Sequence, residues 1–216
     1  NPLATPTLVQ IQHCPSIIAE KILWEKMIHI TDDFLTQLEY KRMLDTFLFQ
    51  QFPWCYDEYK VGGDDQTLEN FQFIHQFYQI ASHYGGVVHE QSTYFEHLLP
   101  ILSRVEYIGL HRIKANLQPL FKEAYKSDFH ADYSDDTGLC SHMTTGIYYL
   151  NSCNGYTEFE NGQKVDCRAN RWITFPANWQ HRGVSQTDMR LKLVINFNFF
   201  TPHLNNSREA ENNSDK

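Results

Sequence analysis

The sequence lacks any apolar run of the roughly 18 residues that a transmembrane helix needs. It also lacks a Cys-x-x-Cys motif, and its cysteines are odd in number. Neither a disulfide framework nor a zinc knuckle is therefore indicated, and we expect a protein of the reducing cytoplasm. The five cysteines are Cys14, Cys55, Cys140, Cys153 and Cys167.

Positive charge is also scarce, with 18 Lys and Arg against 26 Asp and Glu and a net charge of −8. This balance argues against a membrane surface or a nucleic acid as partner, because both are anionic. The 216 residues are 42% hydrophobic, which suits a globular domain with a sizeable core. We expect one domain over residues 1–204 and a flexible tail over 205–216, where apolar residues are almost absent.

The first half of the chain carries helical signals. Apolar residues recur at helical spacing after residue 33, and Thr31 or Asp32 is the expected N-cap of that helix. Residues 94–105 indicate a second amphipathic helix, and residues 71–78 a strand between the two. We therefore expect helical support over about residues 1–106.

From about residue 107 the apolar period changes from helical spacing to two, which indicates strands. Asn161-Gly162 between two of them predicts a hairpin with a type I′ turn. Helices first and many short strands afterwards predict a mainly β jelly roll, over about residues 107–200, braced by helices. The eight expected strands cover residues 107–117, 129–133, 142–151, 156–160, 163–168, 171–176, 181–185 and 190–200.

Three residues of this region form a candidate metal site. His130 and Asp132 share one face if their segment is extended, because side chains alternate along a strand. They are either two metal ligands or a hydrogen-bonded pair without a metal. His181, 49 residues after Asp132, completes a set of two histidines and one carboxylate. Such a set binds non-haem Fe(II) and leaves positions open for substrate and O2.

A cation follows on the last expected strand. Arg190, nine residues after His181, shares a face by alternation with Lys192, Val194 and Asn196. A cation on an inner wall needs an anionic partner, and a small dicarboxylate beside the iron would supply one. Lys192 faces the same way and is the alternative to Arg190.

The order His130-x-Asp132, His181 and Arg190 resembles the 2-oxoglutarate- and Fe(II)-dependent dioxygenases. It is most similar to their prolyl 4-hydroxylase-like branch, including small bacterial and phage members. The resemblance covers roughly residues 107–200 and implies a double-stranded β-helix. It also implies that Arg190, Tyr149 in "GIYYLN" and Asn116 in "HRIKANL" contact 2-oxoglutarate.

The resemblance further implies an activity and its cofactors. The implied cofactors are Fe(II) and 2-oxoglutarate, with ascorbate as reductant and O2 as co-reactant. The expected reaction hydroxylates an unactivated C–H bond of a small molecule, peptide or protein, with a prolyl residue as the leading target. The chemistry occurs at the iron, so no side chain is expected as a general base. Asn154-Gly155 replaces the branch's usual glycine pair, which weakens inference about substrate. The alternatives are a jelly-roll binding module without activity and a demethylase that uses the same iron chemistry.

Overall fold

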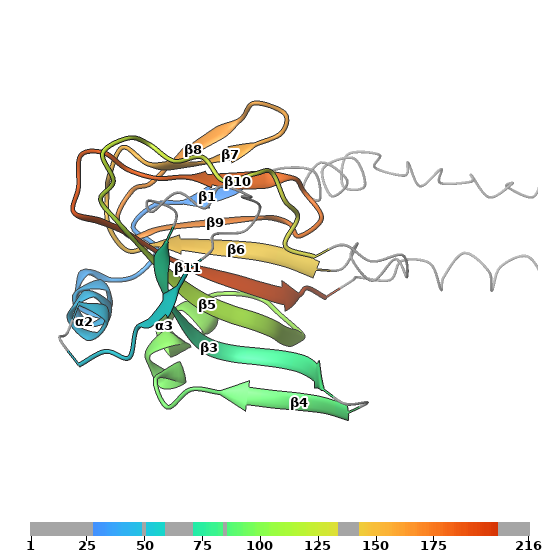
Figure 1. The fold of residues 1–216 in the computed structure, drawn as a ribbon. Coiled ribbons are helices and arrows are strands. Elements are labelled where there is room, and N and C mark those ends of the chain that lie inside the picture. The colour runs from blue at the N-terminus through green and yellow to red at the C-terminus, as the bar shows by residue number, and fades with distance from the viewer. Residues whose placement is uncertain (1–27, 49–50, 59–70, 84–85, 134–142, 203–216) are drawn as a thin grey trace, which may run out of the picture.

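A large antiparallel sheet forms one wall of the molecule (Figure 1). The computed structural model describes residues 28–48, 51–58, 71–83, 86–133 and 143–202. In spatial order the strands of this sheet are β1 (His29–Thr31), β9 (Arg171–Pro176), β6 (Met143–Tyr149), β11 (Leu191–Phe200), β5 (Gly109–Pro119), β3 (Gln72–His83) and β2 (Cys55–Asp57), with β4 (Gly86–Gln91) also paired to β3.

A smaller sheet of three strands accompanies the large one (Figure 1). It contains β10 (His181–Val184), β7 (Tyr156–Phe159) and β8 (Lys164–Asp166), in that order. Residues 126–130 run beside β10 and pair with it through two bridges, Lys126 to Val184 and His130 to His181. Two antiparallel sheets connected in this way confirm the predicted jelly roll of the double-stranded β-helix type.

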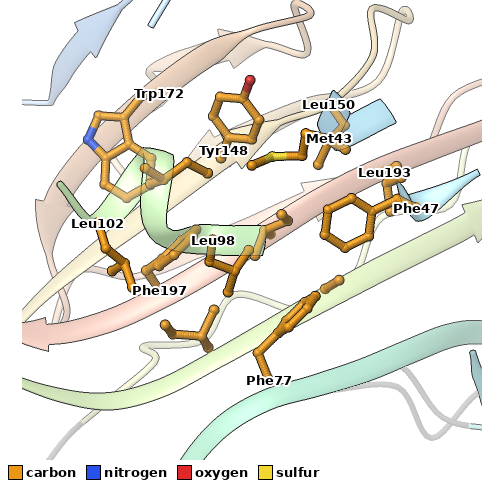
Figure 2. Close-up of a cluster of buried hydrophobic side chains, with 14 of the residues drawn as sticks. Met43, Phe47, Phe77, Leu98, Leu102, Tyr148, Leu150, Trp172, Leu193 and Phe197 are labelled. Atoms are coloured by element: carbon orange, nitrogen blue, oxygen red, sulfur yellow. The ribbon is translucent and has the colours of Figure 1, made fainter. Parts of the chain in front are cut away.

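The large sheet has two chemically different faces, and β11 shows why. Its alternate residues Leu193, Ile195 and Phe197 are fully buried against the helices, in the cluster drawn in Figure 2. The residues between them face the smaller sheet and are mostly polar. Along β11 the period-two pattern therefore separates a hydrophobic outer face from a mostly polar inner face. Labelled members of the outer core are Met43, Phe47, Phe77, Leu98, Leu102, Tyr148, Leu150, Trp172, Leu193 and Phe197.

The first predicted helix is present as α2 (Gln37–Phe47), but the predicted N-cap is wrong. Thr36 caps the helix and forms a reciprocal capping box with Glu39. Thr31 belongs to β1, and the Asp32 carboxylate binds the Arg171 guanidinium, with 2.6 Å between Oδ1 and Nε. Thr31 and Asp32, the two predicted N-caps, therefore both contact β9 instead.

The second predicted helix is shorter than residues 94–105. A 3₁₀ turn over Phe95–Leu98 leads into α3 (Leu99–Leu102), which has Pro100 in its first turn. Proline is tolerated there because the first N–H groups of a helix have no partner inside it.

The N-terminal part was predicted to be helical support with one strand over residues 71–78. In the structure it contributes four strands, β1 to β4, beside its helices. The predicted tail, residues 205–216, lies outside the described residues. None of the helices in the described ranges is both long and apolar enough to cross a membrane.

The predicted hairpin joins β7 to β8, but its turn is not type I′. Type I′ requires positive φ at two central residues, and of the described residues in this loop only Gly162 has it, at 84°. The Gly162 N–H donates to the Phe159 carbonyl, and the Phe159 N–H donates to the Gln163 carbonyl. The loop is therefore three residues long, with glycine in the left-handed position.

Candidate metal and cosubstrate site

The backbone itself brings His130 and His181 together. The N–H of each residue donates to the carbonyl of the other, at 3.0 and 2.9 Å. Asp132 lies two residues further along, and one possible ligand atom from each of the three side chains lies within 4.8 Å of the others. The smaller sheet therefore assembles the predicted triad from segments about 50 residues apart in sequence.

Both imidazoles are oriented by carbonyl oxygens. His130 Nδ1 lies 3.2 Å from the Asp128 carbonyl, and His181 Nδ1 lies 2.9 Å from the Trp179 carbonyl. A carbonyl only accepts, so each Nδ1 is the protonated nitrogen and each neutral ring keeps Nε2 as a free acceptor. Burial lowers the pKa of His181 despite the nearby carboxylate, which favours this neutral form. Imidazoles that are held at Nδ1 and leave Nε2 free are suited to metal binding.

Asp132 is held by three neighbours although only 6% of its side chain is exposed. Thr145 donates to its Oδ2 at 2.7 Å, Asn198 donates to the same oxygen at 3.0 Å, and Arg112 donates to Oδ1 at 3.4 Å. Burial raises the pKa of Asp132, but His181, Arg112 and these hydrogen bonds together hold it below its ordinary value. The side chain is therefore an oriented carboxylate, the form that binds a metal.

The network around Asp132 gives a first prediction. Thr145→Val removes the 2.7 Å hydrogen bond and keeps the shape of the side chain. We expect metal affinity to fall roughly 10-fold, because outer partners of metal ligands typically contribute about 10–100-fold. Thr144→Val is the matched control, since alternation places Thr144 on the opposite face of β6. Equal metal affinity in the two variants, measured by titration calorimetry with Mn(II), would contradict this role of Thr145.

A cavity of about 300 Å³ extends from the triad between the two sheets. This volume is at the lower end of the roughly 300–1,000 Å³ that small-molecule sites have. Polar side chains of β5 and β11 form much of one wall, and Thr157 and Gly183 belong to the facing strands. Most of the residues that line the cavity are therefore polar, and the three candidate metal ligands are among them.

Lys192 lies in this cavity and is 3% exposed. Its Nζ donates to the carbonyls of Val184 at 2.8 Å and Tyr156 at 3.3 Å, and it has no carboxylate partner among the described residues. Burial holds the pKa of Lys192 below its ordinary value. A buried ammonium group with only carbonyl partners is costly and would gain from an anion.

The predicted cosubstrate residues are placed differently from one another. Asn116 is buried and lines the cavity, as does Lys192. Arg190 is exposed, precedes β11 and does not line the cavity. Tyr149 is fully buried behind the lining, where its hydroxyl is 2.7 Å from that of Thr157. The structure thus places Lys192 and Asn116 in the same cavity as the triad, but not Arg190. Tyr149 does not line the cavity either, and it contacts the lining residue Thr157.

Several residues of the site were missed by sequence reasoning. Arg112, Thr145 and Asn198 hold Asp132, and Lys114 and Thr157 line the cavity. Alternation would have found Lys114, because it lies between Arg112 and Asn116 on the same face of β5. Thr145 and Asn198 carry no local signal, since only the pairing of β6 with β11 places them beside each other.

Neither the family models nor the curated proteins compared with the chain gave a match. Solved structures do match in fold. A prolyl hydroxylase from Trichoplax adhaerens, in complex with a hypoxia-inducible-factor peptide fragment, is 15% identical, with 88% of this chain and 94% of that chain covered and a TM-score of 0.55. The viral collagen prolyl hydroxylase of Paramecium bursaria Chlorella virus-1 is 13% identical, with 82% and 97% covered and a TM-score of 0.51.

A non-heme α-ketoglutarate-dependent epimerase from nogalamycin biosynthesis is 11% identical to the chain. The match covers 87% of this chain and 84% of the epimerase, with a TM-score of 0.56. At such identities the likeness concerns the fold. The chain therefore has the fold of the 2-oxoglutarate oxygenases, as the resemblance of its motifs had implied.

Proposed function

We propose that the protein is an Fe(II)- and 2-oxoglutarate-dependent dioxygenase that hydroxylates an unactivated C–H bond. One observation carries the proposal: a single cavity contains the set of His130, Asp132 and His181 together with a buried lysine, Lys192, that has no carboxylate partner among the described residues. Two imidazoles and a carboxylate suit Fe(II), and the lysine suits the distal carboxylate of a keto diacid.

The three metal ligands fit Fe(II) by their chemistry. The hydrogen bonds at Nδ1 leave Nε2 of His130 and His181 available, and Asp132 is an oriented carboxylate. No thiolate belongs to this set, which argues against a structural zinc site. Iron bound there would supply the oxidative chemistry with O2, while the protein positions and secludes the reactants.

Lys192 and Thr157 fit the distal carboxylate of 2-oxoglutarate better than Arg190 and Tyr149. Thr157 pairs with Gly183, which lies two residues after His181 on β10. The next residue is Val184, and its carbonyl accepts a hydrogen bond from Lys192 Nζ. At about 3.3 Å per residue, this separation from His181 is roughly 10 Å along the strand. A five-carbon diacid chelating the metal would span such a distance. Tyr149 then positions Thr157 through their shared hydrogen bond.

The substrate proposed on the resemblance is a prolyl residue of a peptide or protein, with O2 as co-reactant and ascorbate as the reductant that maintains Fe(II). Among the solved structures of this fold, the Trichoplax enzyme was obtained with a peptide. The part of the cavity beside Lys114 is where a substrate would approach the metal.

The proposed function predicts slow conversion of 2-oxoglutarate to succinate by purified protein with Fe(II), O2 and ascorbate. We expect His181→Ala to abolish this conversion, because it removes a metal ligand. The measurement is succinate by mass spectrometry, with anaerobic samples as controls. A protein that holds iron and forms no succinate, yet binds a peptide tightly, would favour the binding-module alternative.

A further inference from the structure

The cavity contains more positive charge than iron and 2-oxoglutarate would use. Its lining includes Arg112, Lys114 and Lys192 but only one carboxylate, Asp132. A bound Fe(II) ion and the two carboxylates of 2-oxoglutarate would cancel each other's charge. A filled site would still hold three cations against one carboxylate, in a protein whose net charge is −8.

Lys114 carries the charge that has no assigned partner. Arg112 already donates to Asn198 and Asp132, and Lys192 is assigned above to the cosubstrate. The Lys114 ammonium group makes no hydrogen bond or ion pair within the part of the chain that is described. Asp57 and Asp132 act on it electrostatically, but Asp57 accepts a 2.9 Å hydrogen bond from Gln72 and does not line the cavity. Asp132 already accepts hydrogen bonds from Thr145, Asn198 and Arg112.

The position of Lys114 is close to the candidate metal site. It lies two residues from Arg112 on the same face of β5, or about 7 Å along the strand. Asn196 lies opposite Lys114 on β11, and its buried Oδ1 has no hydrogen-bond partner. Burial and the nearby Arg112 hold the pKa of Lys114 below its ordinary value, as expected for an under-compensated cation.

From this arrangement we infer that the substrate carries an anionic oxygen group, a carboxylate or a phosphate, which binds Lys114 beside the metal. The inference rests on the proposed function and narrows its substrate class. An anion there would pair the free ammonium group in a partly buried place, where charge-assisted hydrogen bonds are strong. The positive cavity in an acidic protein would also attract anionic substrates selectively.

The test uses protein loaded with Mn(II) and saturated with 2-oxoglutarate, so that the site of Lys192 is filled. The probes are matched pairs: N-acetyl-L-proline and its amide, benzoate and benzamide, and phenyl phosphate and phenol. Paramagnetic broadening of probe proton signals reports binding close to the metal. We expect the anion of at least one pair to bind about tenfold more tightly than its neutral partner, and the pairs distinguish carboxylate from phosphate.

The variants decide whether Lys114 causes this preference. Lys114→Met should reduce the anion preference to less than about threefold, whereas Lys122→Met, which changes an exposed lysine outside the cavity, should retain it. Arg112 is left intact because it also holds Asp132. The inference is overturned if no pair shows the preference, or if the preference survives in Lys114→Met.

The cosubstrate provides a separate control. Broadening of 2-oxoglutarate itself reports whether the proposed cosubstrate site exists. Its absence in the wild-type protein would contradict the proposed function and this inference together. If the broadening of 2-oxoglutarate is present in the wild-type protein and lost in Lys114→Met, Lys114 belongs to the cosubstrate site. That result would overturn the inference but not the proposed function.

Discussion

Replacing Asp132 with alanine should remove most of the metal affinity of the protein. We expect the affinity for Fe(II) or Mn(II) to fall by on the order of 100-fold or more, above the roughly 10–100-fold typical for the loss of an outer partner. The variant removes the only carboxylate of the triad and leaves the Arg112 guanidinium facing the two histidines without its ion-pair partner. Titration calorimetry and elemental analysis measure the loss.

A matched control for this variant is Asp128→Ala. Asp128 is an exposed carboxylate on the other side of His130, and its contribution to the site is the backbone carbonyl that binds His130 Nδ1. This carbonyl remains when the side chain is shortened, so metal affinity should be retained. Unchanged metal binding in Asp132→Ala, or equal losses in both variants, would exclude the triad as the metal site.

Replacing Lys192 with methionine should weaken 2-oxoglutarate binding by about 2–3 kcal/mol, or roughly 30–150-fold, because it removes a charge-assisted partner in a secluded site. Metal affinity should be retained, since Lys192 is not part of the triad. Arg190→Met is the control, because that exposed cation lies two residues earlier and outside the cavity. If Arg190→Met carries the loss instead, the assignment to Arg190 that the family resemblance implies is right and the assignment to Lys192 is wrong.

The stability of Lys192→Met separates lost binding from lost folding. Its ammonium group is buried with only carbonyl partners, so replacing it with an apolar side chain of similar length should not lower the free energy of unfolding. We expect the thermal midpoint without ligands to stay equal or rise. A large fall in the midpoint would mean that the two carbonyls depend on the lysine for their hydrogen bonds.

Cosubstrate affinity should also depend on pH through Lys192. Burial lowers the pKa of Lys192 in the folded protein, so its charge is lost at a lower pH than that of an exposed lysine. Binding of a carboxylate needs that charge, and affinity should therefore fall as pH rises through the lowered pKa. The unfolded chain binds the proton more tightly, so this residue adds stability as pH rises, the opposite direction to cosubstrate binding.

The fold was predictable because its strands carry a period of two and its helices do not. β6, β9 and β11 lie within the predicted strand ranges, β5 overlaps its range and ends at Pro119 instead of residue 117, and α2 follows its apolar spacing. The errors came from competition between local and distant partners. Asp32 could cap a helix, but in the structure it forms an ion pair with Arg171, and Thr36 with Glu39 supplies the cap.

The site was predictable only where its residues lie in order along the chain. His130 and Asp132 form a local pair, and His181 follows at a spacing that resembles the family. Spacing did not distinguish Arg190 from Lys192, because both occupy the same face by alternation. The distinction depends on where β11 begins, and Leu191 is its first residue. Thr145 and Asn198 became visible only through the pairing of β6 with β11.

An anaerobic titration followed by visible absorption tests directly whether one cavity holds Fe(II) and 2-oxoglutarate together. A keto acid that chelates Fe(II) gives a charge-transfer band that neither component gives alone. We predict this band in the wild-type protein, no band in Asp132→Ala, and a band in Lys192→Met only at roughly 30–150-fold higher 2-oxoglutarate. An iron-loaded wild-type protein that shows no band at millimolar 2-oxoglutarate would contradict the account.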